Sequence, residues 1–114
     1  MVKIIYNEKI LNLFSIFMYV GGLTLYPFII LRKRYKNGNE IIKNHEMIHI
    51  KQQIELLIIG FYILYILEYL VRFILYQDAE KAYKSISFEK EAYKYEKNLN
   101  YVKNRPIWSW IKYL

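Results

Sequence analysis

The first forty residues contain short hydrophobic segments separated by glycine, proline and asparagine. Residues 23–32 are rich in β-branched and aromatic side chains and are predicted to form a strand, and residues 2–6 are predicted to form a shorter one. Pro27 cannot donate a backbone hydrogen bond within a sheet, so the longer strand is expected at an edge. The segment between the two, residues 10–20, is apolar and fits either a helix or a strand.

The middle of the chain is predicted to form two successive helices. A turn at residues 37–39 precedes the first helix, which is expected over residues 40–58. The second helix is strongly apolar, covers residues 54–76 and is interrupted near Gly60. A switch from a mixed to an almost wholly apolar composition therefore separates two helices that follow each other closely.

The C-terminal third is predicted to form one long helix followed by an aromatic tail. Ser87 is a suitable N-cap for a helix over residues 88–103, and Pro106 follows its end. The apolar stripe of this helix has the spacing of a buried face and consists of Phe88, Ala92, Tyr95, Leu99 and Val102. In the tail, Trp108 and Trp110 are expected to dock on the core of the domain.

These elements predict an α+β fold in one domain over residues 1–114. We expect a small N-terminal antiparallel sheet with an edge strand, followed by three main helices. A chain of this length can bury a single modest core.

The formal charge is +7, from 17 lysines and arginines against 10 acidic residues. Such a balance attracts nucleic acid or anionic lipid. The basic residues are scattered apart from one cluster at residues 32–36, and no RNA-binding signature or recognition helix accompanies them. We therefore expect no nucleic-acid partner and favour a basic surface that faces a membrane. The chain has no cysteine, which excludes disulfides and thiolate metal sites.

The two histidines of the chain lie four residues apart with a glutamate between them, in the sequence His45-Glu46-Met47-Ile48-His49. On a helix, positions i and i+4 share one face, so both imidazoles can bind the same metal ion. Glu46 would then lie close to a water molecule at that ion and could act as its base. This H-E-x-x-H pattern predicts a catalytic zinc site.

A catalytic zinc site needs a third protein ligand, and without another histidine or a cysteine it must be a carboxylate. Glu55 is too far along the helix of the histidines, and Glu68 is expected to pair with Arg72, four residues later. The best candidates are Glu89 and Glu91, which are about 200° apart around a helix, so at most one can face the metal. The spacing alone leaves the choice between these two open.

The order of these elements resembles the gluzincin group of zinc metallopeptidases, which includes thermolysin. It is most similar to the compact catalytic domains of membrane metalloproteases of the CAAX-processing and antibiotic-sensor-receptor types. In those enzymes the third ligand is the first residue of a Glu-x-x-(Ala/Cys)-Asp motif. Residues 89–93, Glu-Lys-Glu-Ala-Tyr, resemble it, which implies that Glu89 is the ligand and that Ala92 packs against the histidine helix. Tyr93 stands where that family usually has an aspartate that supports a zinc-bound histidine.

The resemblance implies a peptidase in which Glu46 acts as the general base and a peptide or protein substrate pairs with the edge strand, residues 23–31. A tyrosine that stabilises the oxyanion is expected among Tyr93, Tyr95 and Tyr101. Gln52 follows His49 by three residues on the same helix face, where we expect it either to line the cleft or to lie on the helix surface.

Residues 10–31 and 56–74 are each long enough to cross a bilayer. The first segment begins like a signal peptide but lacks a small-residue cleavage site. If the second crossed, the last helix could not supply a ligand to the histidines, so we expect a buried or membrane-surface helix instead. The protein is expected in the cytoplasm or attached peripherally to a membrane, and a homodimer could also cover the apolar helix. The alternative function is an inactive, membrane-peripheral interaction protein that keeps a metallopeptidase-like fold.

Overall fold

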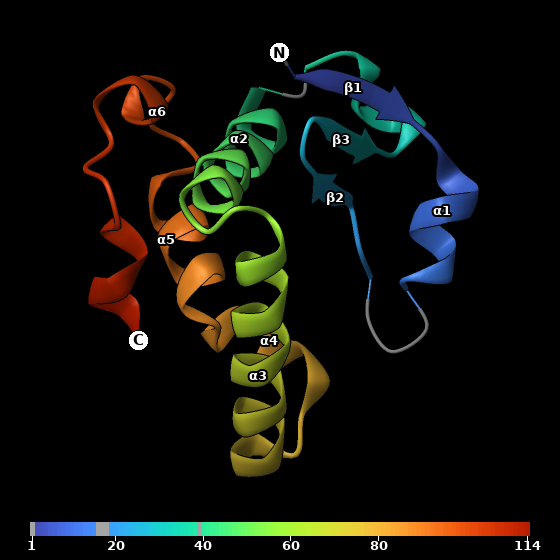
Figure 1. The fold of residues 1–114 in the computed structure, drawn as a ribbon. Coiled ribbons are helices and arrows are strands. Elements are labelled where there is room, and N and C mark those ends of the chain that lie inside the picture. Colours follow the sequence, from blue (N-terminus) through green and yellow to red (C-terminus); the bar gives the residue numbers. More distant parts are fainter. Residues whose placement is uncertain (1, 16–18, 39) are drawn as a thin grey trace.

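A computed structural model describes residues 2–15, 19–38 and 40–114 (Figure 1). A small three-stranded sheet lies at the N-terminal end, with strands β1 (Lys3–Tyr6), β2 (Gly22–Leu25) and β3 (Phe28–Leu31). Strand β3 is central, and it pairs in parallel with β1 and in antiparallel with β2. Several helices follow, so the predicted α+β class is confirmed, with a sheet that is mixed because β1 runs parallel to its neighbour.

The single strand expected over residues 23–32 is wrong, because this segment folds into the hairpin of β2 and β3. The chain turns at the cis peptide bond between Tyr26 and Pro27. The backbone N–H of Tyr26 leaves the sheet and donates to the Gln53 side chain at 2.7 Å. In the described sheet β1 and β2 lie at the two edges, with β2 next to the histidine helix, and β3 lies between them. Of the undecided segment 10–20, the first part belongs to helix α1 (Glu8–Leu13), and residues 16–18 lie outside the described residues.

Helix α2 (Glu40–Glu55) packs between the sheet and the C-terminal helices (Figure 1). Toward the sheet it contributes Ile50 to a hydrophobic cluster with Ile29 and Leu31. Most of its other buried residues are polar, including both histidines, Glu46 and two glutamines. The expected helix is therefore confirmed, but its buried face differs from an ordinary apolar one.

Helix α3 (Ile59–Tyr76) follows after a sharp break. The break occurs at Leu57 and Ile58, whose φ angles are positive, and Gly60 lies inside the first turn of α3. Ile58 N–H donates to the Gln53 carbonyl at 2.7 Å, a bond that closes the end of α2. The expected interruption is thus present, two residues before the glycine.

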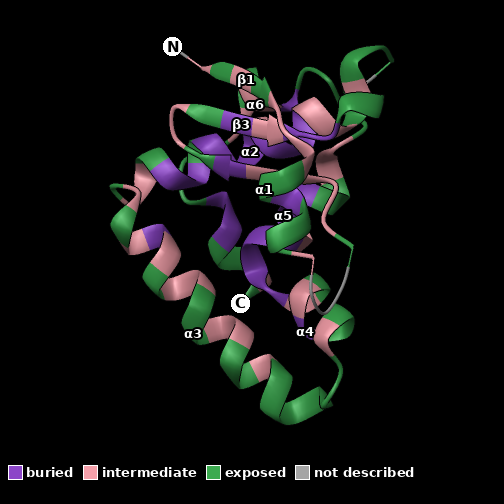
Figure 2. Ribbon diagram, turned by 90° about the vertical axis from the view of Figure 1, so that its right-hand side faces the viewer, coloured by how far each residue is buried: buried purple, intermediate pink, exposed green. Residues whose placement is uncertain are grey.

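Most side chains of α3 are exposed, as Figure 2 shows. Among the described residues of this helix only Phe61 is buried, and it packs in a cluster with Phe88 and Trp110. Of the two expectations for this segment, the buried helix is therefore wrong, and the membrane-surface helix stays a prediction. By length and composition α3 can cross a membrane, and it is the one helix of the described chain that can. Residues 10–31 form no such helix in their described part, since they contain α1, β2 and β3.

The last predicted helix is divided into α5 (Ser87–Tyr95) and α6 (Tyr101–Asn104), after a short α4 (Ala79–Ser85). Ser87 is the first residue of α5 and not its cap; its N–H and hydroxyl donate to Glu68 of α3 at 2.9 and 2.5 Å. Glu68 therefore holds the start of α5 and is not the partner of Arg72 that the spacing predicted.

Two 3₁₀ helices, Lys33–Lys36 and Ser109–Tyr113, complete the described elements. The second packs against α5 and buries Trp110, whereas Trp108 stays 41% exposed. Docking of the aromatic tail on the core is thus confirmed for one of the two tryptophans.

Candidate metal centre

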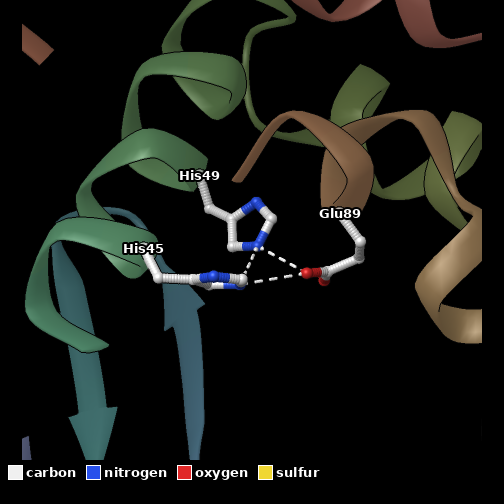
Figure 3. A group of neighbouring side chains, drawn as sticks. All are labelled: His45, His49 and Glu89. Carbon is white, nitrogen blue, oxygen red and sulfur yellow. Dashed lines mark hydrogen bonds and ion pairs between the residues drawn. The ribbon is translucent and has the colours of Figure 1, made fainter. Parts of the chain in front are cut away.

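Helix α2 presents His45 and His49 on one face, directed toward the first turn of α5 (Figure 3). The Nε2 atoms of the two rings are 3.2 Å apart, and each lies 3.1 Å from the same oxygen, Oε1 of Glu89. The three residues are only 4–5% exposed. The helical spacing of the histidines and the packing of α5 on α2 thus bring together three groups that can hold a metal ion.

The charges of these groups are strongly coupled. Burial alone would lower the pKa of His45, but hydrogen bonds to Glu89 and Glu96 outweigh it and raise the pKa to about 10. Burial likewise opposes the positive charge on His49, and the nearby Glu89 carboxylate raises its pKa nonetheless. For Glu89, burial would raise the pKa, but the two histidines hold it far below its usual range. The Glu89 carboxylate is therefore kept negative next to a positive charge, which either the protonated histidines or a metal ion can supply.

Glu96 supports His45 from the side opposite Glu89. Its Oε1 lies 2.8 Å from Nδ1 of His45, which leaves Nε2 of that ring directed at the cluster. Glu96 follows directly after α5, and Asn44 of α2 fixes this end of the helix by donating to the carbonyls of Tyr95, Glu96 and Asn98 at 2.8–3.2 Å. A carboxylate on the outer nitrogen of a ligand histidine sets both its orientation and its basicity.

Gln52 supports His49 in the same way. Its Oε1 lies 2.7 Å from Nδ1 of His49, and its Nε2 donates to the Phe88 carbonyl and to Glu91. Gln52 is fully buried and so lies neither in a cleft nor on the helix surface, the two places considered from the sequence. At this position both the oxygen and the nitrogen of the amide have partners, which the helix pattern alone does not predict.

Glu91 belongs to a different buried cluster and not to the group of the histidines. It accepts hydrogen bonds from Arg105 and from the Tyr101 hydroxyl, and Arg105 also binds Glu55. Of the two glutamates that the sequence left open, Glu89 lies beside the histidines, and Glu91 faces the C-terminal segment. Ala92 packs against Ile48 of α2, as expected from the resemblance.

Strand β2 approaches the cluster from the other side of α2. The Thr24 hydroxyl donates to Oε1 of Glu46 at 2.6 Å, which holds this carboxylate near the histidines. Gly22 permits the approach, since a Cβ atom there would lie 3.3 Å from the Glu46 carboxylate and 2.9 Å from Leu31. A side chain at this position would therefore push β2 away from Glu46.

Two cavities meet at Glu46 and Gly22. One has a volume of about 270 Å³, is lined largely by aromatic and aliphatic side chains of α3 and β2, and includes His49 and Glu89. The other has a volume of about 490 Å³, is more polar, and includes His45 and Glu96. The cluster is thus buried but borders open space on both sides of Glu46.

Compared with protein-family models, with curated proteins and with solved structures, the chain shows no match.

Tyrosines surround the cluster, but not all of those named from the sequence. The Tyr93 ring packs edge-on against His45, with ring centroids 4.6 Å apart, and its hydroxyl donates to that of Tyr83. Tyr95 and Tyr101 stack on each other, and Tyr101 donates to Glu91, so neither lies at the cluster. Tyr65 of α3 donates to the second oxygen of Glu89 at 2.6 Å.

Several of these residues carry no signal in the sequence. Thr24, Tyr65 and Tyr83 reach the site from elements remote in the chain, and only their packing reveals them. Glu96 is also a carboxylate downstream of the histidines, but nothing in its spacing shows whether it would bind a metal or orient a residue that does. The structure brings the predicted residues His45, Glu46, His49 and Glu89 to one place.

Proposed function

We propose that this chain is a zinc metallopeptidase of the gluzincin type, with His45, His49 and Glu89 as metal ligands and Glu46 as general base. The proposal rests on one observation. Two histidine Nε2 atoms and one carboxylate oxygen of Glu89, all buried, lie close together, and Glu46 lies on the same helix as the two histidines. Buried imidazoles and carboxylates are seldom brought this close together unless they bind a metal ion or take part in catalysis.

The donor set fits zinc. Two imidazole nitrogens and one carboxylate oxygen are a usual set for a catalytic zinc ion, and they leave a fourth position open. Ligands around a tetrahedral zinc are about 3.3 Å from one another, given bonds of roughly 2.0–2.1 Å. The three donor atoms here are separated by 3.1 to 3.2 Å. The residues therefore need little rearrangement to hold the ion.

Bound at this site, zinc would supply a Lewis acid that makes a water molecule more acidic and polarises a peptide carbonyl. Glu46 would accept a proton from the attacking water as the new carbon–oxygen bond forms, and would pass it to the leaving amine as the carbon–nitrogen bond breaks. Thr24 would keep the Glu46 carboxylate in position through its hydrogen bond at 2.6 Å. Glu96 and Gln52 would orient the two histidines.

The substrate proposed is a peptide or protein segment bound in extended form along β2. This strand lies at an edge of the described sheet and next to Glu46, so an added strand would pass the catalytic residues. The smaller cavity, with Phe61, Tyr65 and Leu23 in its lining, would receive a large apolar side chain beside the scissile bond.

Tyr93 and Tyr83 are the proposed donors to the oxyanion. Both line the larger cavity. Burial raises the pKa of Tyr93 to about 12, and burial raises that of Tyr83 as well, so both hydroxyls keep their protons at neutral pH. A protonated hydroxyl can donate to a developing negative charge.

The test is a comparison of wild type with Glu46→Gln on a broad set of peptides. We expect the variant to bind zinc as wild type does and to lose cleavage by about 10²–10⁴-fold, the usual contribution of a general base. Glu80→Gln, on the exposed surface of α4, removes the same charge and should keep full activity. Equal cleavage by Glu46→Gln and wild type would refute the assigned role of Glu46.

A second candidate is favoured by the exposed apolar face of α3. In this alternative the chain is a non-catalytic protein that lies on a membrane surface, with α3 against lipid. Ile63, Leu67 and Ile74 are each more than half exposed, and the net charge of +7 favours anionic lipid over a second copy of the same chain. Binding to vesicles that contain anionic lipid, together with no cleavage by the zinc-loaded wild type, would support this candidate over the peptidase.

A further inference from the structure

Helix α2 carries two adjacent glutamines that are both almost fully buried, Gln52 and Gln53. Gln53 binds the hairpin of β2 and β3. Its Nε2 donates to the Thr24 carbonyl at 2.9 Å, and its Oε1 accepts from the backbone N–H of Tyr26. Gln52 instead faces α5 and touches His49. Two neighbours of the same type and burial thus have different partners, and of the two only Gln52 contacts a proposed metal ligand.

The side chain of Glu91 faces hydrogen-bond donors. Arg105 donates from Nε to Oε2 at 2.5 Å and from Nη2 to Oε1 at 3.0 Å. The Tyr101 hydroxyl donates to Oε2 at 2.6 Å. A guanidinium group has donors and no acceptor, so both Glu91 oxygens act as acceptors. Arg105 and Glu91 are also deeply buried, which keeps this arrangement away from competing water.

The orientation of the Gln52 amide follows from these contacts. The atom 3.0 Å from Oε1 of Glu91 also lies 3.1 Å from the Phe88 carbonyl, and both of these partners only accept. That atom must therefore be the amide nitrogen, and the amide oxygen must be the atom 2.7 Å from Nδ1 of His49. An oxygen that can only accept requires a proton on Nδ1.

We infer that a buried chain of hydrogen bonds from Arg105 through Glu91 and Gln52 fixes a proton on Nδ1 of His49, so that Nε2 presents its lone pair to a metal ion. Arg105, Glu91 and Gln52 are positioning residues in this arrangement. The inference rests on the proposed metal site, and it makes the C-terminal segment that carries Arg105 a part of that site. It also accounts for Glu91, the second glutamate of the 89–93 motif, as the link between the two.

The first test compares Gln52→Met with Gln53→Met, the matched control. Both variants remove a buried amide of the same size from the same helix, so both are expected to lose stability. Only Gln52→Met should weaken zinc binding, by about 10–100-fold, as for other residues that orient metal ligands. Zinc affinity measured by competition with a chelator gives this difference. Equal affinities in the two variants would overturn the inference.

The second test follows the proton of the His49 ring in Gln52→Met, which removes the acceptor of Nδ1 and keeps a side chain of similar length. Without that acceptor, the ring is expected to carry its proton on Nε2, which lies 3.1 Å from Oε1 of Glu89. Long-range proton–nitrogen NMR spectra of the ring nitrogens report this directly, in protein treated with a chelator.

With the ring in its neutral form, Nδ1 of His49 is expected to be protonated in wild type and in Gln53→Met, and unprotonated in Gln52→Met. A protonated Nδ1 in Gln52→Met would contradict the inference, because a merely structural role for Gln52 leaves the ring unchanged. The spectra do not depend on zinc, so a wild type that binds no zinc would refute the proposed function separately. A wild type that binds zinc, with Gln52→Met binding it equally well, would refute only the inference.

Discussion

Two regions of the molecule depart from the usual distribution, in which apolar side chains are buried and charged ones exposed. The interface between α2 and α5 buries polar side chains, and the outer face of α3 exposes apolar ones. Between α2 and α5, the buried side chains are histidines, glutamates and glutamines. On α3, isoleucines, leucines and valine face outward, and among the described residues of the helix only Phe61 is buried. Burying polar groups and exposing apolar ones both cost free energy. Each region is therefore explained by something other than the stability of the isolated domain.

The two regions differ in how completely their side chains are satisfied. Each polar group at the centre of the α2–α5 interface has a partner, from Glu96 at one end to Arg105 at the other. The apolar side chains of α3 have no comparable cover in the described structure. The polar groups of the first region are thus paired within the protein, whereas the apolar side chains of the second are exposed. Substitutions in the two regions should accordingly affect different properties.

The largest effect is expected from Glu91→Ala, which leaves the buried guanidinium of Arg105 with part of its partners removed. Breaking a buried ion pair in this way costs about 3–5 kcal/mol of unfolding free energy. Glu80→Ala breaks the exposed pair of Glu80 with Lys84 and should cost at most about 0.5 kcal/mol. Urea unfolding of both variants measures the difference. Similar losses in the two would mean that the buried network does not hold α2 and α5 together.

Two substitutions within α3 sharpen the contrast on a single helix. Phe61→Ala should destabilise the protein by about 3–5 kcal/mol, because it leaves a cavity between α3 and α5. Ile74→Ala, at a position 69% exposed, should change the unfolding free energy by less than about 0.5 kcal/mol. Thermal unfolding of the two variants checks this. A large loss in Ile74→Ala would show that the outer face of α3 is covered within the protein itself.

The polar interface should respond to pH. In protein treated with a chelator, the raised pKa of His45, about 10 against a usual 6.5, adds stability that is complete below pH 6.5 and is lost as the pH rises toward 10. The lowered pKa of Glu89 adds stability above its usual 4.5 that is lost in acid. Unfolding free energies should therefore be highest between about pH 5 and 6.5.

Zinc affinity should follow the opposite trend between pH 6 and 9, because the histidines must lose their protons to bind the ion. Titrations in lightly buffered solution should show protons released as zinc is added. An affinity that is constant over this range would contradict the assignment of His45 and His49 as ligands.

Among the residues of the site, the smallest effect is expected at the side formed by β2. Thr24→Val removes the hydroxyl that orients Glu46 and keeps the branched shape of the side chain. We expect a loss of kcat of about tenfold, the value of a hydrogen bond worth roughly 1–1.5 kcal/mol, with unchanged zinc content. Peptide cleavage and metal analysis on the same samples measure both. An unchanged kcat would indicate that α2 alone holds Glu46.

The sequence predicts the part of the site that follows from one helix, because the spacing of His45 and His49 determines their common face. It could not choose between Glu89 and Glu91, since both occupy the first turns of α5 and only Arg105, from a distant segment, draws one of them away. Glu96 supports His45, and the sequence could not predict this because the contact depends on how α5 ends.

The errors in the fold have similar causes. Composition predicted one strand where the chain turns at Pro27, because the residues on both sides are equally suited to a sheet. The long C-terminal helix divides because the segment after Tyr95 leaves the helical path, and Asn44 of α2 binds the carbonyls there. The exposure of α3 contradicts the rule that apolar helices are buried, and a rule based on composition cannot anticipate such a case.

The most direct measurement is the zinc content of purified wild type, His49→Ala and Glu89→Gln by elemental analysis after gentle dialysis, with Glu80→Gln as a control for loss of charge. We expect one zinc per chain in wild type and in Glu80→Gln, and little or none in the other two. Wild type without zinc even after it is added back, or Glu89→Gln with the full amount, would contradict the proposed metal centre.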